Sequence, residues 1–199
     1  MKKIGIFGGT FNPVHFGHIH LALSLKESQG LDQVVFSPNY ESPFPAKGDF
    51  SVTPAQRFEM LKLALEGVPG CFAIDYEITR PGPSYTIDLV RHVKSVFCGA
   101  DDGLFILLGE DLLEGFSRWK DKEELVRLAA PLIGSRNFLK RGLSLGSELL
   151  EILDNGRVNI PIVEISSSNI KHRLKKELYC GHLVAQKVLD YIHANKLYL

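Results

Sequence analysis

The sequence is short of cysteine and of long apolar runs. Its three cysteines, Cys71, Cys98 and Cys180, are odd in number among 199 residues and lack CxxC spacing. This pattern indicates reduced thiols in a cytoplasm and argues against a cysteine zinc site. No apolar run approaches the roughly 20 residues of a membrane-spanning helix, and the run at 4–7 is too short for a signal peptide. We therefore expect a soluble cytoplasmic protein without a membrane partner.

A surplus of charge of either sign is also lacking. The 23 Lys and Arg residues balance 23 Asp and Glu residues, so the formal net charge is zero. This balance gives no reason to expect a nucleic-acid polymer as partner, and an anionic ligand must be held by local arrangement. The length suits a single domain over residues 1–199, because two domains would be cramped.

Apolar runs and helical patterns alternate along the chain. Strands are expected at 3–9, 33–39, 71–78, 104–109, 131–135 and 157–165, and helices at about 15–26, 54–66, 86–97, 122–130, from 168 and from 183. This alternation predicts an α/β fold: a Rossmann-like doubly wound parallel sheet with helices on both faces and a C-terminal helical part over about 168–199. The stretch before Gly156 is polar and weakly patterned, and no helix is predicted there.

The stretch GGTFNPVHFGH at 8–18 directly follows the first expected strand. Gly8 and Gly9 permit a tight turn and the close approach of a ligand, and the first amides of the following helix favour an anion. His15 and His18 lie three residues apart and so share one helix face. These features indicate a polyphosphate site, although they also fit a plain strand-to-helix turn or, with a third ligand, a zinc site. Neither a P-loop GK[ST] nor a GxGxxG fingerprint is present at this turn.

Polar stretches follow four of the expected strands, at 8–15, 38–44, 109–111 and 135–137. Ligands of parallel sheets bind beyond the carboxyl ends of the strands, so these stretches are expected to meet at one edge. The stretch at 38–44 opens a loop that is rich in proline and glycine and lacks periodicity.

A second candidate phosphate element is ISSSNIKHRL at 165–174. Ser167 or Ser168 can cap a helix there, and its exposed amides, the serine hydroxyls and Lys171 would then face an anion. The alternative is an ordinary capped amphipathic helix with a basic solvent face. The expected buried stripe consists of Ile170, Leu174 and Leu178.

The stretch GTFNPVHFGH resembles the signature of the nucleotidyltransferases that carry an HxGH motif. The chain resembles the bacterial nicotinate-nucleotide adenylyltransferases nearly end to end, because further motifs fall in that family's order. These motifs are PSYT (83–86), GED (109–111) followed by Trp119, ISSSNIKHRL (165–174) and VLDYIHANKLY (188–198). The resemblance implies a single nucleotidyltransferase domain and an enzyme of NAD biosynthesis.

The resemblance also implies a reaction. In this family the adenylyl group of ATP is transferred to nicotinate mononucleotide, giving deamido-NAD and pyrophosphate by direct attack without a covalent enzyme intermediate. ATP and nicotinate mononucleotide are thus the implied partners, and the enzyme positions two anions and stabilises transition-state charge. Mg²⁺ is expected as a cofactor held by substrate phosphates and water rather than by protein ligands. The sequence leaves open whether the protein forms a homo-oligomer.

The residues of the site follow from the same resemblance. The implied catalytic residues are His15, His18 and Lys171, and imidazole suits the task because its pKa allows partial positive charge near neutral pH. The implied ATP-binding residues are Gly8, Gly9, Thr10, Phe11, His15, His18, Gly109, Arg136, Ser166, Ser167, Ser168 and Lys171. The implied nicotinate mononucleotide-binding residues are Ser84, Tyr85, Thr86, Asp111 and Trp119, with Lys47 as a further candidate from the loop.

Each residue at the nicotinate end has an expected task. Trp119 would stack on the pyridine ring, since aromatic pairs favour offset stacking. The amides around Thr86, where a helix begins, would hold the nicotinate carboxylate. Asp111 would accept hydrogen bonds from the nicotinate-side ribose hydroxyls.

Three positions depart from the family pattern. Asn12 replaces an aspartate, Lys171 replaces an arginine, and Phe44 stands where a histidine would fall. Asparagine caps turns about as well as aspartate, whereas lysine keeps the charge and loses the bidentate fork. Two alternatives stay open: a sister transferase acting on nicotinamide mononucleotide or pantetheine phosphate, and a nucleotide-binding protein without catalysis.

Overall fold

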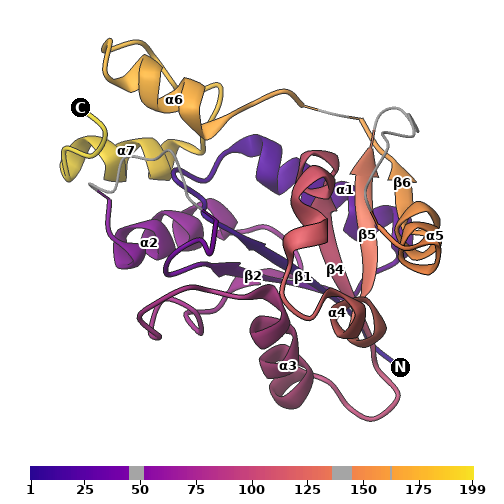
Figure 1. The fold of residues 1–199 in the computed structure, drawn as a ribbon. Helices are drawn as coiled ribbons and strands as arrows, with labels where there is room; N and C mark the ends of the chain where they lie inside the picture. The colour runs from indigo at the N-terminus through magenta and orange to yellow at the C-terminus, as the bar shows by residue number, and fades with distance from the viewer. Residues whose placement is uncertain (45–51, 136–144, 162) are drawn as a thin grey trace. The chain divides into compact units, whose positions relative to one another are not determined.

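The computed structural model describes residues 1–44, 52–135, 145–161 and 163–199. Its strands form a six-stranded sheet in the order β3-β2-β1-β4-β5-β6, and β1, β4, β5 and β6 pair in parallel (Figure 1). The strands are β1 (Lys3–Gly9), β2 (Gln33–Pro38), β3 (Cys71–Ala73), β4 (Gly103–Gly109), β5 (Ala130–Ser135) and β6 (Arg157–Asn159). This is the strand order of a doubly wound sheet, and the predicted Rossmann-like α/β fold is confirmed.

Helices connect these strands as the alternating pattern predicts. They are α1 (Phe16–Gln29), α2 (Pro54–Leu65), α3 (Thr86–Phe97), the 3₁₀ segment η1 (Glu110–Arg118), α4 (Lys122–Leu128), α5 (Ser147–Asn155), α6 (Ser167–Leu174) and α7 (Gln186–Ala194). The start of α2 illustrates the local logic: the Thr53 side chain accepts from the Gln56 N–H, while the Gln56 side chain accepts from the Thr53 N–H. This capping box fixes the first turn of α2.

Two predicted strands are shorter than expected, and one helix was missed. β3 ends at Ala73 because the chain then turns, with the Thr79 N–H bonded to the Asp75 carbonyl. β6 ends at Asn159, shortly before Pro161, which has no N–H for a ladder. Helix α5 buries only Leu149 and Leu153, a stripe too thin to stand out in a polar segment.

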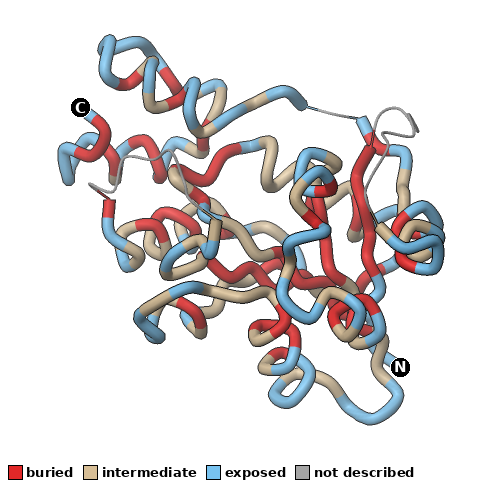
Figure 2. Tube along the Cα trace, viewed as in Figure 1, coloured by how far each residue is buried: buried red, intermediate tan, exposed pale blue. Residues whose placement is uncertain are grey.

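The core is built around the central strands. Figure 2 shows β1, β4 and β5 as mostly buried, in agreement with runs such as the fully buried Pro131–Ser135 of β5. Cys71, Cys98 and Cys180 are not joined in a disulfide, and Cys71 and Cys180 are buried while Cys98 is half-buried. Among the described residues, no helix is long and apolar enough to cross a membrane.

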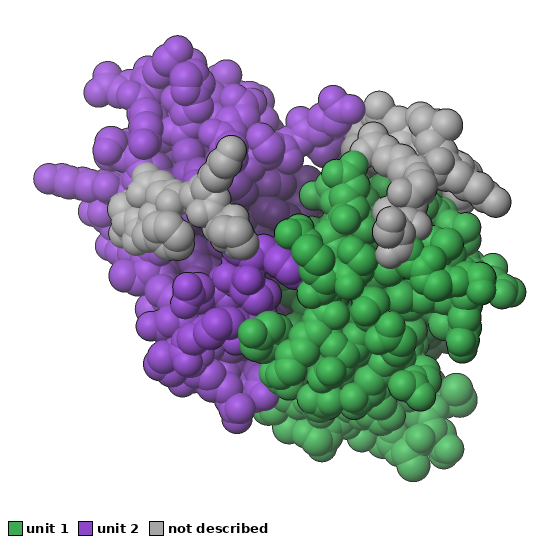
Figure 3. All heavy atoms as spheres, viewed as in Figure 1, with its two compact units in different colours: residues 1–8, 21–35, 85–162 green, residues 9–20, 36–84, 163–199 purple. Residues whose placement is uncertain are grey.

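The chain divides into two compact units, coloured separately in Figure 3. Unit 1 contains residues 1–8, 21–35 and 85–162, and unit 2 contains residues 9–20, 36–84 and 163–199. Within unit 1, α3 packs on α4 and α5 packs on β5, while within unit 2, α2 packs on both β3 and α7. The predicted C-terminal helices, α6 and α7, belong to unit 2, and the assignment of the whole chain to one domain stays a prediction.

Candidate active site

The two histidines of the HxGH stretch are stacked on each other at the start of α1. Their ring centroids lie 3.6 Å apart with an interplanar angle of 23°. The backbone N–H of His15 donates to Nδ1 of His18 over 3.2 Å. Because that nitrogen accepts, a neutral His18 carries its proton on Nε2, which makes Nε2 a hydrogen-bond donor. The predicted shared face of the two rings is confirmed.

His15 holds a buried polar atom without a partner. The residue is 7% exposed, and its Nδ1 has no hydrogen-bond partner among the described residues. A Cβ on Gly17 would lie only 3.1 Å from this nitrogen, so the absence of a side chain at Gly17 lets the His15 ring lie where it does. Among the residues that the structure describes, no cluster of three or more metal-ligating side chains occurs, and the zinc alternative therefore finds no third ligand there.

The charge state of the pair differs from the sequence-based expectation. Burial lowers the pKa of His15 to about 4. Burial and the nearby His15 lower the pKa of His18 to about 3. Both imidazoles are therefore neutral near pH 7, and the expected partial positive charge is wrong for the protein without nucleotide. The rings can serve as hydrogen-bond groups rather than as cations.

The loop before the histidines turns at Phe11, whose backbone has a φ of 48°. The Phe11 ring is 2% exposed and meets the His18 ring edge-on, with centroids 5.1 Å apart. A Cβ on Gly9 would lie 3.1 Å from this ring, so Gly9 makes room for Phe11. Since the Phe11 side chain is enclosed, an ATP contact at this residue would come from its backbone. The neighbouring Thr10 is exposed, as its predicted role requires.

The three serines before α6 have different partners. Ser166, rather than Ser167 or Ser168, is the N-cap, because its side chain accepts from the Asn169 N–H over 3.2 Å. The Ser167 hydroxyl instead donates to the Pro13 carbonyl over 2.9 Å, which joins α6 to the loop that carries the histidines. Ser168 is exposed.

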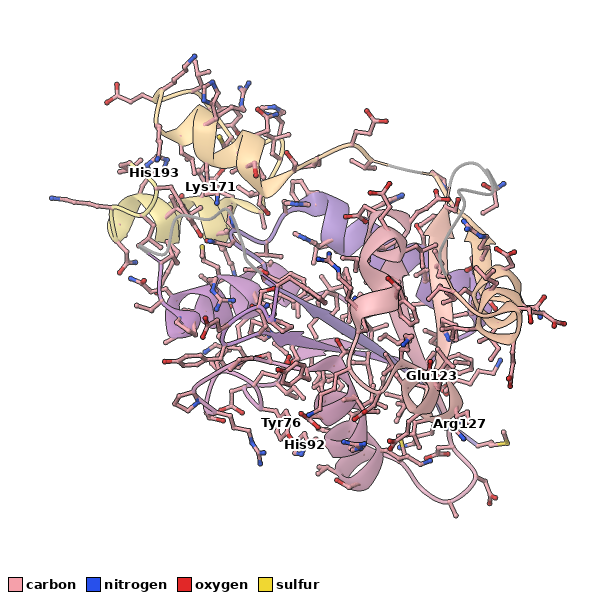
Figure 4. The ribbon with its side chains drawn as sticks, in the orientation of Figure 1. Tyr76, His92, Glu123, Arg127, Lys171 and His193 are labelled. Carbon is pink, nitrogen blue, oxygen red and sulfur yellow. The ribbon has the colours of Figure 1, made fainter. Side chains whose placement is uncertain are left out.

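Lys171 lies on α6 and is half-buried (Figure 4). The buried stripe of this helix consists of Ile170 and Leu174. The expected third member, Leu178, is wrong, because α6 ends at Leu174 and Leu178 is 46% exposed. Ile170 and Leu174 still define the buried face of α6. Lys171, the residue after Ile170, lies beside this face and is half-buried.

In unit 1, helix α3 begins at Thr86 as predicted, with Tyr85 as an N-cap residue that makes no side-chain cap bond. The Lys120 ammonium lies 4.5 Å above the Tyr85 ring. Trp119 is half-buried and packs on Phe116, with centroids 5.0 Å apart. The start of α3 thus presents the N–H groups of a helix N-terminus, and the Trp119–Lys120 segment presents an indole and a positive charge.

At the end of β4, the Asp111 carboxylate lies over Gly109. A Cβ on Gly109 would come within 2.5 Å of Asp111 Oδ1, so a side chain at residue 109 would require the Asp111 carboxylate to move. The preceding Glu110 was not predicted as important, yet it accepts from Arg157 over 2.7 Å and from the Ser135 hydroxyl over 2.8 Å. These bonds connect the end of β4 to β5 and β6. The exposed Asp111 follows directly after Glu110 in the same short turn.

The predicted site residues fall into two groups that the structure describes separately. Unit 2 brings together Gly9, Thr10, Phe11, His15, His18, Ser166, Ser167, Ser168 and Lys171, and it also contains Ser84. Unit 1 contains Gly8, Tyr85, Thr86, Gly109, Asp111 and Trp119. Lys47 and Arg136 lie outside the described residues. Ser84 serves the backbone, since its hydroxyl accepts from the Tyr40 N–H over 2.9 Å.

One residue of this region was missed in the sequence. Arg57 on α2 is 4% exposed and donates to the carbonyl oxygens of Thr10, at 2.7 Å, and Asn39, at 2.6 Å. A signal was available, because Arg57 occupies the first position of a stripe continued by Met60 and Leu61. A charged residue on the buried face of an amphipathic helix indicates a specific set of polar partners.

Comparison with known proteins fits this arrangement. The cytidylyltransferase-like family model matches residues 6–173. A probable nicotinate-nucleotide adenylyltransferase of Borreliella burgdorferi is 36% identical over 198 residues, which cover 99% of this chain and 97% of the relative. One of Dictyoglomus thermophilum is 35% identical over 202 residues, covering 99% and 100%.

A solved structure shares the fold. It is the Plasmodium falciparum nicotinic acid mononucleotide adenylyltransferase complexed with NaAD, with a TM-score of 0.73, 21% identity and coverage of 100% of this chain and 98% of that chain. At this level of identity the likeness concerns the fold alone. From the family model and the sequence relatives, the chain belongs to the cytidylyltransferase-like family and to the nicotinate-nucleotide adenylyltransferases.

Proposed function

We propose that the protein transfers the adenylyl group of ATP to nicotinate mononucleotide, forming deamido-NAD and pyrophosphate. The observation that carries this proposal is the stacked, neutral histidine pair at the start of α1, with a buried His15 Nδ1 that lacks a partner among the described residues. Buried polar atoms are nearly always hydrogen-bonded, and an unpaired one in a site points to a ligand. The relatives, whose names specify this reaction, supply the identity of the substrates.

In the proposed reaction, a phosphate oxygen of nicotinate mononucleotide attacks the α-phosphorus of ATP. The bond from that phosphorus to the oxygen shared with the β-phosphate breaks, and pyrophosphate leaves with the electron pair. The Nε2–H of His18 would donate to a phosphate oxygen that gains charge in the transition state. Because the imidazole is neutral and enclosed, this hydrogen bond acts in a setting of low polarity, where it is stronger than in water.

The α6 element would supply the remaining phosphate contacts. Its first amides face an anion favourably, and Lys171 adds a positive charge one turn along the helix. The bond from Ser167 to the Pro13 carbonyl holds this helix start against the histidine loop. Mg²⁺ would arrive bound to the ATP phosphates, with water as its other ligands.

The nicotinate mononucleotide would be held by residues of unit 1. Trp119 would stack on the pyridine ring, and backbone N–H groups at the start of α3 would donate hydrogen bonds to the nicotinate carboxylate. A carboxylate only accepts hydrogen bonds, whereas an amide also presents N–H donors, so these amides would favour the acid over the amide. The exposed Asp111 carboxylate would accept from the ribose hydroxyls.

The test is pyrophosphate release by the purified protein with ATP and one acceptor at a time. The acceptors are nicotinate mononucleotide, nicotinamide mononucleotide and phosphopantetheine. The proposal expects the fastest release with the nicotinate compound. Faster release with either of the others would assign the protein to a sister transferase. Saturable ATP binding without release in any mixture would establish a binding protein without catalysis.

A further inference from the structure

Two buried side chains hold the loop before the histidine pair from either side of Phe11. On one side, Arg57 Nη1 donates to the carbonyl oxygen of Thr10 over 2.7 Å. On the other side, the Tyr198 hydroxyl donates to Oδ1 of Asn12. Arg57 is 4% exposed and Tyr198 is 3% exposed, so water competes little with either bond. Neither side chain belongs to the predicted phosphate-binding set.

Arg57 also ties this loop to the segment that follows β2. Its Nη2 donates to the carbonyl oxygens of Asn39, at 2.6 Å, and Tyr40, at 3.0 Å. The Asn39 N–H in turn donates to the carbonyl oxygen of Gly9 over 3.0 Å. A guanidinium is the one side chain that can donate in several fixed directions at once, and lysine would keep the charge without this geometry.

Phe11 lies between the two contacts in a backbone conformation that it would not adopt unaided. Its φ of 48° falls in the left-handed region, which costs a non-glycine residue about 1 kcal/mol or more and persists only where the surroundings enforce it. The bonds on Thr10 and Asn12 act on the two residues that flank Phe11, so they are placed to enforce this conformation.

The conformation of Phe11 decides where its ring lies. The ring packs on Phe36, with centroids 5.9 Å apart, and presents an edge-on contact to His18 at 5.1 Å. His18 also stacks on the His15 ring, and its Nδ1 accepts a hydrogen bond from the His15 N–H. A change in the Phe11 backbone would therefore remove one of the surfaces that hold the His18 imidazole.

We infer that Arg57 and Tyr198 are positioning residues, which set the orientation of the His18 imidazole through the backbone and ring of Phe11. The catalytic consequence rests on the proposed function, whereas the geometric consequence does not. The inference gives Asn12 a role of its own: its side-chain oxygen receives the C-terminal tyrosine, a task that either asparagine or aspartate can perform. It also predicts that the last residues of the chain matter for turnover.

The first test follows the His18 ring directly by NMR in Tyr198→Phe, Arg57→Lys and Arg57→Met. The control for Tyr198→Phe is Tyr191→Phe, which removes a hydroxyl from α7. The control for the Arg57 variants is Arg80→Met, which removes an exposed guanidinium that lies over the Tyr76 ring. We expect the His18 ring protons to shift and the ring to begin titrating above pH 5 in the three variants. The controls should match the wild-type protein.

The second test compares kinetic constants. We expect Tyr198→Phe to lower kcat about tenfold with KM for both substrates unchanged within about twofold, because a misplaced group slows chemistry more than binding. Arg57→Lys should fall between the wild-type protein and Arg57→Met. If Arg57→Met fails to fold, Tyr198→Phe and Arg57→Lys carry both tests, since each keeps most of the packing.

The outcomes separate the two proposals. Unchanged His18 resonances and titration in folded Tyr198→Phe and Arg57→Lys would overturn the positioning role. A loss of stability in these two variants without any change in the His18 signals would also overturn the positioning role, because it would show a merely structural role. A wild-type protein that releases no pyrophosphate would overturn the proposed function, while the NMR comparison would still decide the positioning role.

Discussion

The histidine pair of unit 2 and the charged surface of α3 and α4 in unit 1 both gather polar side chains, and they do so in opposite ways. On the surface, the Arg91 guanidinium lies 2.6 Å from Glu124, 3.2 Å from Asp88 and 3.5 Å from Asp121. All four of these side chains have an opposite partner and remain more than 40% exposed. Such contacts are screened by water and contribute little.

The histidine pair has the opposite properties. The His15 ring is enclosed, its Nδ1 has no hydrogen-bond partner within the described part of the chain, and burial holds the pKa of both histidines well below the ordinary range. Buried polar groups that lack a hydrogen-bond partner in the folded protein can bind a ligand, whereas charged groups that pair with each other have less to offer one. The comparison teaches that the density of charged residues is a poor guide to the site and that incomplete pairing under burial is a better one.

Removing one imidazole is the strongest test of the difference between the histidine pair and the charged surface. We expect His18→Ala to lower turnover about 100-fold, because the loss of one donor to a developing oxyanion costs roughly that much. The measurement is kcat for pyrophosphate release. His193→Ala, on the exposed face of α7 (Figure 4), serves as the control. A turnover within about twofold of wild type in folded His18→Ala would remove this histidine from the catalytic role.

The second prediction concerns acid. The unfolded chain binds protons at histidine near pH 6.5, whereas the folded pair does so only at about 4 and 3. Between these values the unfolded state binds more protons, so stability falls as the pH falls below 6.5 and levels off near pH 3. We expect the pair to lower the free energy of unfolding by about 2 kcal/mol between pH 7 and pH 5, after allowance for partial solvent access.

Urea denaturation at pH 7 and pH 5 measures this effect. The double variant His15→Gln/His18→Gln lacks the titrating groups and should lose less stability on acidification than the wild-type protein. His193→Gln, which changes an exposed histidine, should lose as much as wild type. Equal losses in wild type and the double variant would mean that the pair titrates normally in the folded protein.

The third prediction displaces an imidazole without removing it. A Cβ at residue 17 would meet Nδ1 of His15 at 3.1 Å, so Gly17→Ala should displace that ring by a few tenths of an ångström from its place in the stack. We expect turnover to fall about tenfold, although alanine improves helix propensity and folding should not suffer. Gly146→Ala is the matched control, because a Cβ there meets nothing within 4 Å. Equal kcat values in the two variants would contradict the prediction.

The extent to which sequence could predict these features follows from the distances along the chain. The start of α2 at Pro54, the start of α3 at Thr86 and the shared face of His15 and His18 are local and were predicted. The contacts of Arg57 with Thr10 and of Tyr198 with Asn12 join residues 47 and 186 positions apart, and no local pattern encodes them.

Two further failures have the same physical origin. Three adjacent serines have equal capping propensity, and tertiary packing decides that Ser166 caps α6 while Ser167 bonds to Pro13. The neutral state of the histidines depends on burial by the folded chain, which spacing does not report. Sequence therefore predicted the helices and strands that carry these residues better than it predicted the residues' partners or charge.

The fourth prediction tests the nicotinate end of the site. Trp119 is half-buried against Phe116 and is proposed to stack on the pyridine ring. We expect Trp119→Ala to raise KM for nicotinate mononucleotide about fivefold and to leave KM for ATP within about twofold, since one aromatic stack contributes about 1 kcal/mol. Trp119→Phe should restore most of the loss. Parallel changes in both KM values would count against stacking.

The smallest effect is expected at the charged surface. The hydrogen bond between Arg91 and Glu124 raises the pKa of the Arg91 guanidinium and lowers the pKa of the Glu124 carboxyl. Both side chains are nevertheless in contact with water. We expect Arg91→Ala to change the unfolding temperature by less than about 3 °C and to leave kcat unaltered, because exposed ion pairs are screened. Thermal unfolding at low and high salt is the measurement, and the small difference from wild type should shrink further as salt rises. A large, salt-independent loss would show that this surface is more than solvated charge, and the contrast with the buried histidines would then have to rest on pairing alone.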